Sequence, residues 1–237
     1  MMRSELKRTM AVLLLAVVSG QASAHEGQHV FSSLMLDRLE VRDSQATGNS
    51  SYWEGQGWLG TELDKLWFKT QGDVRRGRAQ TAEAQLLYSR AIAPFWDVQL
   101  GVRHDLALNG ASSRDYGAVA IKGLAPYKFD VDASLYLGNG GAARVKAGYT
   151  LLFTQRLSLL PEMEANWYGT GDAARGRGAG LSNVDVGLRL RYEVTREFAP
   201  YVGVSWGYKY GNTATLARRN GEPASDLLYT AGVRLWW

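Results

Sequence analysis

Acidic residues recur at every second position in several stretches of this sequence, and carboxylates spaced in this way could attract cations. A side-chain period of two is typical of a β-strand, in which alternate residues lie on one face. Rings of carboxylates select cations in channels. If these faces line one central space, the acids predict a cation path. The candidates are Glu83, Asp97, Asp130, Asp132, Glu162 and Glu164.

Basic residues alternate in the same manner and give these acids a second interpretation. Arg144 and Lys146 stand two residues apart, and a short turn near residue 155 would bring Lys146 almost opposite Glu164. Opposite charges that face each other across a ladder contribute roughly 0.2–1 kcal/mol each. A charge in a narrow lumen also needs a partner or water. The same residues therefore also fit a salt-bridge lattice that stiffens a small barrel, and both interpretations stay open.

Three histidines add possible metal ligands to the luminal acids. The stretch HEGQH places His25 and His29 close together, and a free α-amino group at residue 25 could join them in binding Cu(II) or Ni(II). A short polar tail with incidental histidines is the alternative. His104 is the remaining histidine. Met35 and Met163 could bind Cu(I) as soft ligands, although Met163 shares the phase of apolar neighbours and fits ordinary packing.

Other chemistry is poorly supported by the sequence. His104 stands next to Asp105, but adjacent residues of a strand point to opposite faces, so the two are badly placed as a catalytic pair. No nucleophile motif stands out, and we expect no enzyme. The net charge is +4, and no basic run with interleaved aromatic residues is present. Nucleic acid is therefore not an expected partner.

The alternation continues through most of the chain and predicts an all-β fold of about twelve strands. Each predicted strand is near the roughly 9–11 residues that a tilted strand needs to cross a bilayer. The predicted strands cover residues 33–42, 51–62, 64–72, 82–89, 95–103, 114–123, 128–137, 143–153, 157–168, 181–194, 198–210 and 227–237.

The connections between these strands alternate strictly between two kinds. Short ones fall near residues 63, 92, 125, 155 and 196. Longer or glycine-rich ones, such as 169–180 and 211–225, carry typical loop residues. Short turns on one side and long loops on the other are typical of an outer-membrane barrel. We therefore predict a transmembrane up-and-down antiparallel β-barrel over residues 33–237.

A soluble β-sandwich would show the same period, but with the apolar face inward. The N-terminal sequence favours the barrel. Residues 1–24 contain basic residues, an apolar core and the small-residue end Ala22-Ser23-Ala24, which predicts a secretory signal peptide. Residues 25–32 would then form a short periplasmic segment. Aromatic residues near strand ends, including Trp96 and Trp206, would form girdles at the lipid boundary. Outer-membrane lipid is thus an expected partner, and the cell outer membrane of a Gram-negative bacterium the expected location.

Longer phrases resemble one known family. They include WEGQGWLGTELDKLWFKTQGD, GLSNVDVGLRLRYEVTREFAPYVGVSW and the terminal AGVRLWW. Over residues 31–237 the chain resembles the copper resistance protein B family. The resemblance implies an outer-membrane barrel that binds or passes copper ions in copper tolerance. It also implies periplasmic copper-handling partners such as a multicopper oxidase or a copper chaperone.

One departure from the family pattern concerns the segment before the barrel. Family members typically carry a long Met- and His-rich stretch there, which is reduced here to about HEGQHVF. A copper role would then depend on the barrel, on His25 and His29, or on a partner protein. The alternative function is a structural or general-solute porin-like barrel without metal selectivity.

Overall fold

The computed structural model describes residues 29–108 and 110–237, so the predicted signal peptide and His25 lie outside the described residues. The described chain forms one antiparallel sheet. Its strands are β1 (Phe31–Ser44), β2 (Ser50–Gly60), β3 (Asp64–Arg75), β4 (Arg78–Ala93), β5 (Trp96–Asp105), β6 (Arg114–Ala125), β7 (Phe129–Leu137), β8 (Ala142–Gly148), β9 (Leu151–Leu152), β10 (Leu157–Tyr168), β11 (Gly180–Tyr192), β12 (Phe198–Lys209) and β13 (Ser225–Trp236).

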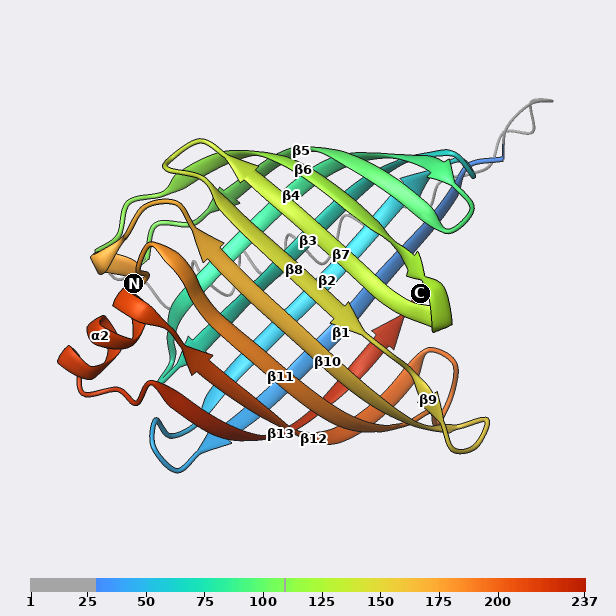
Figure 1. Ribbon diagram of the computed structural model, residues 1–237. Coiled ribbons are helices and arrows are strands. Elements are labelled where there is room, and N and C mark those ends of the chain that lie inside the picture. The colour runs from blue at the N-terminus through green and yellow to red at the C-terminus, as the bar shows by residue number, and fades with distance from the viewer. Residues whose placement is uncertain (1–28, 109) are drawn as a thin grey trace, which may run out of the picture.

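The sheet closes on itself, as Figure 1 shows, because the last strand pairs with the first. The amide of Leu34 donates to the carbonyl of Trp237 at 2.9 Å, and the Trp237 amide donates back at 2.8 Å. β8 and β9 both pair with β10 and form one span interrupted at residues 149–150. The predicted closed barrel of twelve spans is confirmed. Closure leaves no unpaired edge strand.

Alternate residues of each strand face opposite sides of the wall, and the apolar set faces outward. On β5, Leu100 is 50% exposed and Val102 58% exposed, whereas Gln99 and Arg103, which flank them, are 0% and 2% exposed. A barrel wall with apolar residues outside and polar residues inside matches lipid on one face and an aqueous lumen on the other. The predicted orientation of the wall, with apolar residues outside and charged residues inside, is therefore confirmed. It is the opposite of the orientation in a soluble β-sandwich.

The two ends of the barrel differ. Residues 61–63, 94–95, 126–128, 153–156 and 193–197 connect strands at one end, which also holds the C-terminus and the start of β1; we refer to it as the short-turn end. Residues 106–113, 169–179 and 210–224 connect strands at the other, the long-loop end, where α2 (Gly211–Arg219) lies (Figure 1). The sequence predicted a loop at α2. No helix in the described residues is long and apolar enough to cross a membrane.

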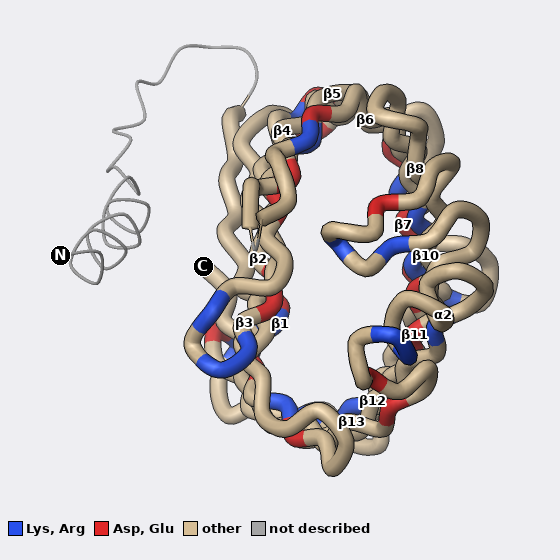
Figure 2. Tube along the Cα trace, turned by 90° about the vertical axis from the view of Figure 1, so that its left-hand side faces the viewer, with Lys and Arg blue, Asp and Glu red and all other residues tan. Residues whose placement is uncertain are grey.

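Two irregularities position charged groups in the lumen. A β-bulge in β1 between Leu36 and Leu39 interrupts the alternation, so that Asp37 and Arg38 both line the lumen. At the long-loop end, the connection from β10 to β11 contains a short 3-10 helix, η2 (Ala173–Arg175). Figure 2 looks down the barrel from this end and shows charged residues along the ring of strands, with a loop beside β10 reaching into the opening.

Candidate functional site in the barrel lumen

The lumen is crossed by a continuous series of ion pairs in which basic and acidic residues alternate. Each link joins a nitrogen and an oxygen that are 2.5 to 3.5 Å apart. We refer to this series as the ion-pair chain. In order, its members are Arg42, Glu40, Arg189, Glu162, Arg38, Glu54, Lys146, Glu164, Arg144, Glu83, Arg103, Asp105 and Arg177.

Glu83 is the most heavily bonded acid near one end of the ion-pair chain. Its carboxylate accepts from Arg144 at 2.7 and 3.0 Å and pairs with Arg103 at 2.7 Å. The Gln85 amide adds a third donor at 3.0 Å. The Arg103 guanidinium also lies 4.4 Å from the ring centroid of Tyr136. Buried charges are tolerated when each one is paired and hydrogen-bonded, which is the case here.

Glu40 on β1 plays the same part near the other end of the ion-pair chain. Its side chain accepts from Arg42 at 2.5 and 2.7 Å and from Arg189 at 3.1 and 3.2 Å. The Tyr201 hydroxyl donates to it at 3.1 Å. Because β11 and β12 supply partners to this carboxylate of β1, the cluster connects β1 to two strands with which it does not pair.

All six carboxylates of the predicted cation path line the lumen. Glu83, Glu162 and Glu164 belong to the ion-pair chain, and Lys146 lies directly opposite Glu164 as predicted, 3.3 Å from its carboxylate. Asp132 pairs with Lys69 at 2.8 Å. Four of the six predicted carboxylates are therefore paired with basic side chains, as the salt-bridge lattice predicted from the sequence requires.

Asp97 and Asp130 differ from the other four acids. Asp97 accepts a hydrogen bond of 3.3 Å from Ser89, and neither aspartate forms an ion pair with any described residue. Both lie near the start of their strands, β5 and β7, and thus toward the short-turn end. They line the same cavity, which has a volume of about 1260 Å³ and reaches Glu222 at the long-loop end. Lys122 is the cross-strand neighbour of Asp97, but it forms no ion pair with either aspartate.

The predicted histidine ligands do not join the luminal carboxylates within the described residues. His104 shares the outward phase with Val102, and its side chain is about half exposed. Its Nδ1 lies 2.6 Å from the carboxylate of Asp115 on β6. His29 precedes β1, and its ring lies 6.3 Å from that of Phe31. In residues 29–108 and 110–237, no group of three or more His, Asp or Glu side chains is placed to hold a metal ion.

The two methionines considered as Cu(I) ligands lie on different faces of the barrel wall. Met163 is 44% exposed on the outer face, in agreement with apolar packing against lipid. Met35 lines the lumen, where an Arg234 nitrogen lies 3.9 Å from its sulfur. A thioether beside a guanidinium is a poor place for a cation, because the positive charge of the arginine opposes it.

Sequence reasoning missed several members of the ion-pair chain. Glu40 and Glu54 were not selected, although each alternates with apolar neighbours in a predicted strand. Asp105 was considered only as a partner of His104, whereas it binds Arg103 at 2.7 Å and Arg177 at 3.1 Å. The sequence signal that could have identified these acids is their position in the alternation, relative to the Leu and Val residues that face outward.

A closed barrel of twelve spans with an apolar outer face and a charged lumen defines the class of outer-membrane β-barrel proteins. Solved structures of that class share the fold. A NanC porin structure matches with a TM-score of 0.56 and 13% identity, over 85% of this chain and 98% of that one. The outer membrane phospholipase of Salmonella typhi, a dimer with bound calcium, matches with a TM-score of 0.51 and 14% identity, over 91% and 94%.

The sequence comparison is more specific. The family model described as Copper resistance protein B precursor matches residues 30–237. Copper resistance protein B of Escherichia coli is 44% identical over 206 residues, covering 86% of this chain and 69% of the relative. A copper resistance protein B homolog of Pseudomonas syringae pv. tomato is 38% identical over 222 residues, covering 91% and 74%. The chain belongs to the copper resistance protein B family.

Proposed function

We propose that this protein resides in the outer membrane of a Gram-negative bacterium and contributes to copper resistance by binding copper ions and passing them through its lumen. Family membership supports the link to copper, and the apolar outer wall supports contact with outer-membrane lipid. Outer-membrane barrels have short periplasmic turns and longer external loops. The short-turn end would therefore face the periplasm, and the long-loop end the exterior.

The observation that carries this proposal is that Asp97 and Asp130 line the lumen and form no ion pair with any described residue. Both lie toward the short-turn end, where β1 begins at Phe31. His25 and His29 stand directly before that strand in the sequence. In our proposal, the imidazoles collect copper ions and the two carboxylates hold them at the inner entrance. Copper accepts both imidazole and carboxylate ligands.

The matched acids and His104 have other parts in this proposal. A passing ion can contact the paired acids only if it replaces one of their basic partners. These acids, Glu83, Glu162, Glu164 and Asp132, therefore set the energy barrier to ion passage through the lumen. His104 faces outward with Asp115 and would bind metal at the outer surface of the barrel. The barrel acts without catalysing a reaction. A periplasmic multicopper oxidase or copper chaperone is the partner that would exchange copper at the short-turn end.

Copper uptake into liposomes loaded with a copper-sensitive dye tests the proposal. The double variant D97N/D130N should lower the rate of Cu(II) entry at least severalfold, with a much smaller effect on Mg(II). The control variant D43N/E62Q removes the same number of exposed carboxylates outside the lumen and should leave both rates unchanged. If the D97N/D130N variant transports Cu(II) at the original rate, the two aspartates are not the entry site.

Separate histidine variants locate the remaining ligands. Replacement of His25 and His29 by alanine should weaken equilibrium Cu(II) binding, and H104A should remove a surface site without slowing copper entry. If the triple histidine variant retains full copper binding and copper tolerance, the histidine assignment is wrong.

A general-solute barrel is the second candidate function, and the luminal cavity of about 1260 Å³ favours it. In planar bilayers, such a barrel would conduct Cu(II) and Mg(II) equally. Selective conductance of Cu(II) would exclude it.

A further inference from the structure

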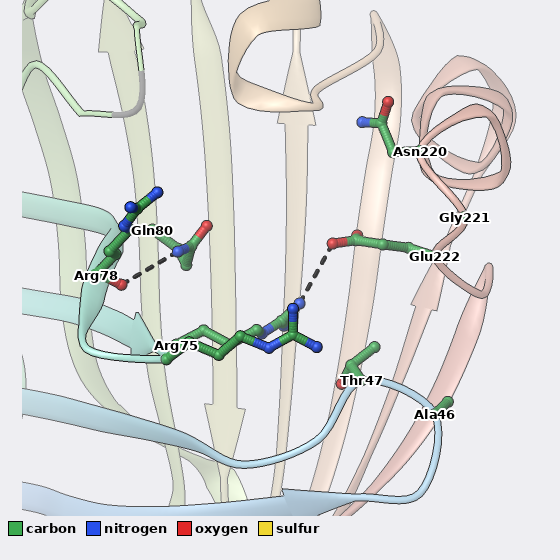
Figure 3. A pocket seen from close by; sticks show the side chains of 9 residues that line it. Ala46, Thr47, Arg75, Arg78, Gln80, Asn220, Gly221 and Glu222 are labelled. Atoms are coloured by element: carbon green, nitrogen blue, oxygen red, sulfur yellow. Dashed lines mark hydrogen bonds and ion pairs between the residues drawn. The ribbon is translucent and has the colours of Figure 1, made fainter.

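Three chain segments at the long-loop end enclose a second, smaller cavity that is separate from the proposed copper entrance. Its volume is about 610 Å³. The β3–β4 turn supplies Arg75, Arg76 and Arg78, and the segment after α2 supplies Asn220 and Glu222. The β1–β2 loop forms the third side. Figure 3 shows Arg75 and Arg78 on one side of the cavity and Glu222 reaching toward Arg75 from the other.

The charges that line this cavity are unbalanced. Glu222 is its single acidic residue among those described, and it is already shared. One carboxylate oxygen lies 3.3 Å from Arg75 and the other 2.8 Å from Lys209. Arg76 and Arg78 form no ion pair with any residue in the described ranges. The Nε of Arg75 is buried and likewise donates to no described acceptor.

The geometry of the turn makes this excess of positive charge costly. Arg75 and Arg78 are directly opposite each other in the β3–β4 pairing. Like charges in that position are destabilising. Arg76 has a φ of 51° and Gly77 a φ of 73°, the left-handed pair that a two-residue hairpin turn requires. Glycine or asparagine would suit the position of Arg76 better. An arginine cluster that violates two local preferences indicates a gain from a bound ligand.

We propose that this cavity is a binding site for a phosphate group. A phosphate monoester carries roughly two negative charges near neutral pH, which match the two unpaired guanidinium groups of Arg76 and Arg78. Arginine recognises phosphate through paired N–H donors, and Arg75 lines the same cavity. The site is at the long-loop end, so the phosphate belongs either to a soluble external solute or to lipopolysaccharide in the outer leaflet.

The test compares two variants in detergent solution. R76S/R78S removes the two unpaired arginines from the exposed turn, and R156S/R196S removes two exposed arginines from turns at the short-turn end. Isothermal calorimetry with inorganic phosphate at fixed ionic strength should show binding to the unmodified protein. R76S/R78S should weaken that binding by about tenfold or more, as loss of two charge-assisted hydrogen bonds predicts. R156S/R196S should bind phosphate within twofold of the original affinity.

A second measurement distinguishes the two sources and checks the fold. Lipopolysaccharide that co-purifies with each protein is quantified, together with the heat-dependent gel mobility of the folded barrel. A lipid source predicts less lipopolysaccharide on R76S/R78S only, and displacement of lipopolysaccharide from the original protein by phosphate. A soluble source predicts equal lipopolysaccharide on all three proteins. If folded R76S/R78S equals the control in both measurements, the cavity is not a phosphate site.

Discussion

The Arg144 guanidinium on β8 donates two hydrogen bonds, of 2.7 and 3.0 Å, to the Glu83 carboxylate on β4. Three strands, β5 to β7, separate these two along the wall of the barrel. The contact therefore crosses the lumen and does not follow the sheet. Because it continues in both directions through the ion-pair chain, it links walls that backbone pairing does not connect. Ion pairs inside the lumen therefore contribute to holding the barrel wall together.

Removing the carboxylate charge of Glu83 should destabilise the barrel. In E83Q, Arg144 and Arg103 lose their shared carboxylate and become buried charges with incomplete pairing. Breaking one partner of a buried pair typically costs about 3–5 kcal/mol. We expect a loss of this size in the free energy of unfolding, measured by urea titration in lipid vesicles. E62Q, which changes an exposed glutamate in a turn, serves as the control and should change stability by less than about 0.5 kcal/mol. Equal stability of both variants would show that the ion-pair chain contributes little.

The outward orientation of the apolar face predicts a depth-dependent penalty for charge. Leu100 lies in the middle of β5 and Leu63 in a turn at the barrel end, and their exposed fractions are similar at 50% and 56%. L100K should destabilise the folded barrel in a bilayer by about 2–4 kcal/mol, and L63K by about 0–1 kcal/mol. The same urea titration measures both. A similar small effect for the two variants would contradict a lipid-facing position for Leu100.

Local pattern and register were enough to predict much of this structure. Alternation on β5 separates Leu100 from Gln99 correctly, and a short turn near residue 155 places Lys146 opposite Glu164. Both predictions depend on neighbouring residues or on one hairpin. The positions of the six predicted luminal acids follow from the same rule, because phase along a strand decides which face a side chain occupies.

The remaining features depend on distances that the sequence does not encode locally. The pairing of Glu83 with Arg144 requires the curvature of a closed barrel, because the two strands are not neighbours. The bulge in β1 adds Arg38 to the lumen by breaking the period that was used to assign faces. Helix α2 has no helical pattern long enough to outweigh its loop-like composition. The outward position of His104 follows from its phase with Val102, a signal that was present in the sequence.

The phosphate-binding proposal predicts a gain of affinity in one variant. Glu222 competes with an anion for Arg75 and Lys209, from which it lies 3.3 and 2.8 Å. E222Q keeps the size of the side chain and removes its charge. We expect inorganic phosphate to bind E222Q severalfold more tightly, because Arg75 in the cavity loses its acidic partner and the negative charge of Glu222 no longer repels the anion. E193Q, at the short-turn end, is the matched control. Unchanged or weaker phosphate binding by E222Q would argue against competition at this site.

The contacts of Glu222 also predict the pH range in which the segment after α2 is held in place. The Lys209 hydrogen bond, together with the charges of Lys209 and Arg75, lowers the pKa of Glu222 below its usual value despite partial burial, which acts in the opposite direction. A group whose pKa is lowered on folding contributes stability above its unfolded pKa, about 4.3 for glutamate, and loses it as the pH falls through the folded value. The connection to Arg75 and Lys209 should therefore persist from pH 8 to about pH 5 and weaken below about pH 4.

A single spin label can report this transition, because the sequence contains no cysteine. The label is attached to N220C, beside Glu222, and its mobility is followed by electron paramagnetic resonance from pH 8 to pH 3. We expect low mobility down to about pH 4 and a rise below it, since protonation of Glu222 removes both ion pairs. In N220C/E222Q the label should be mobile at every pH. If the label is equally mobile with and without Glu222 at pH 7, the two ion pairs do not hold this segment in place.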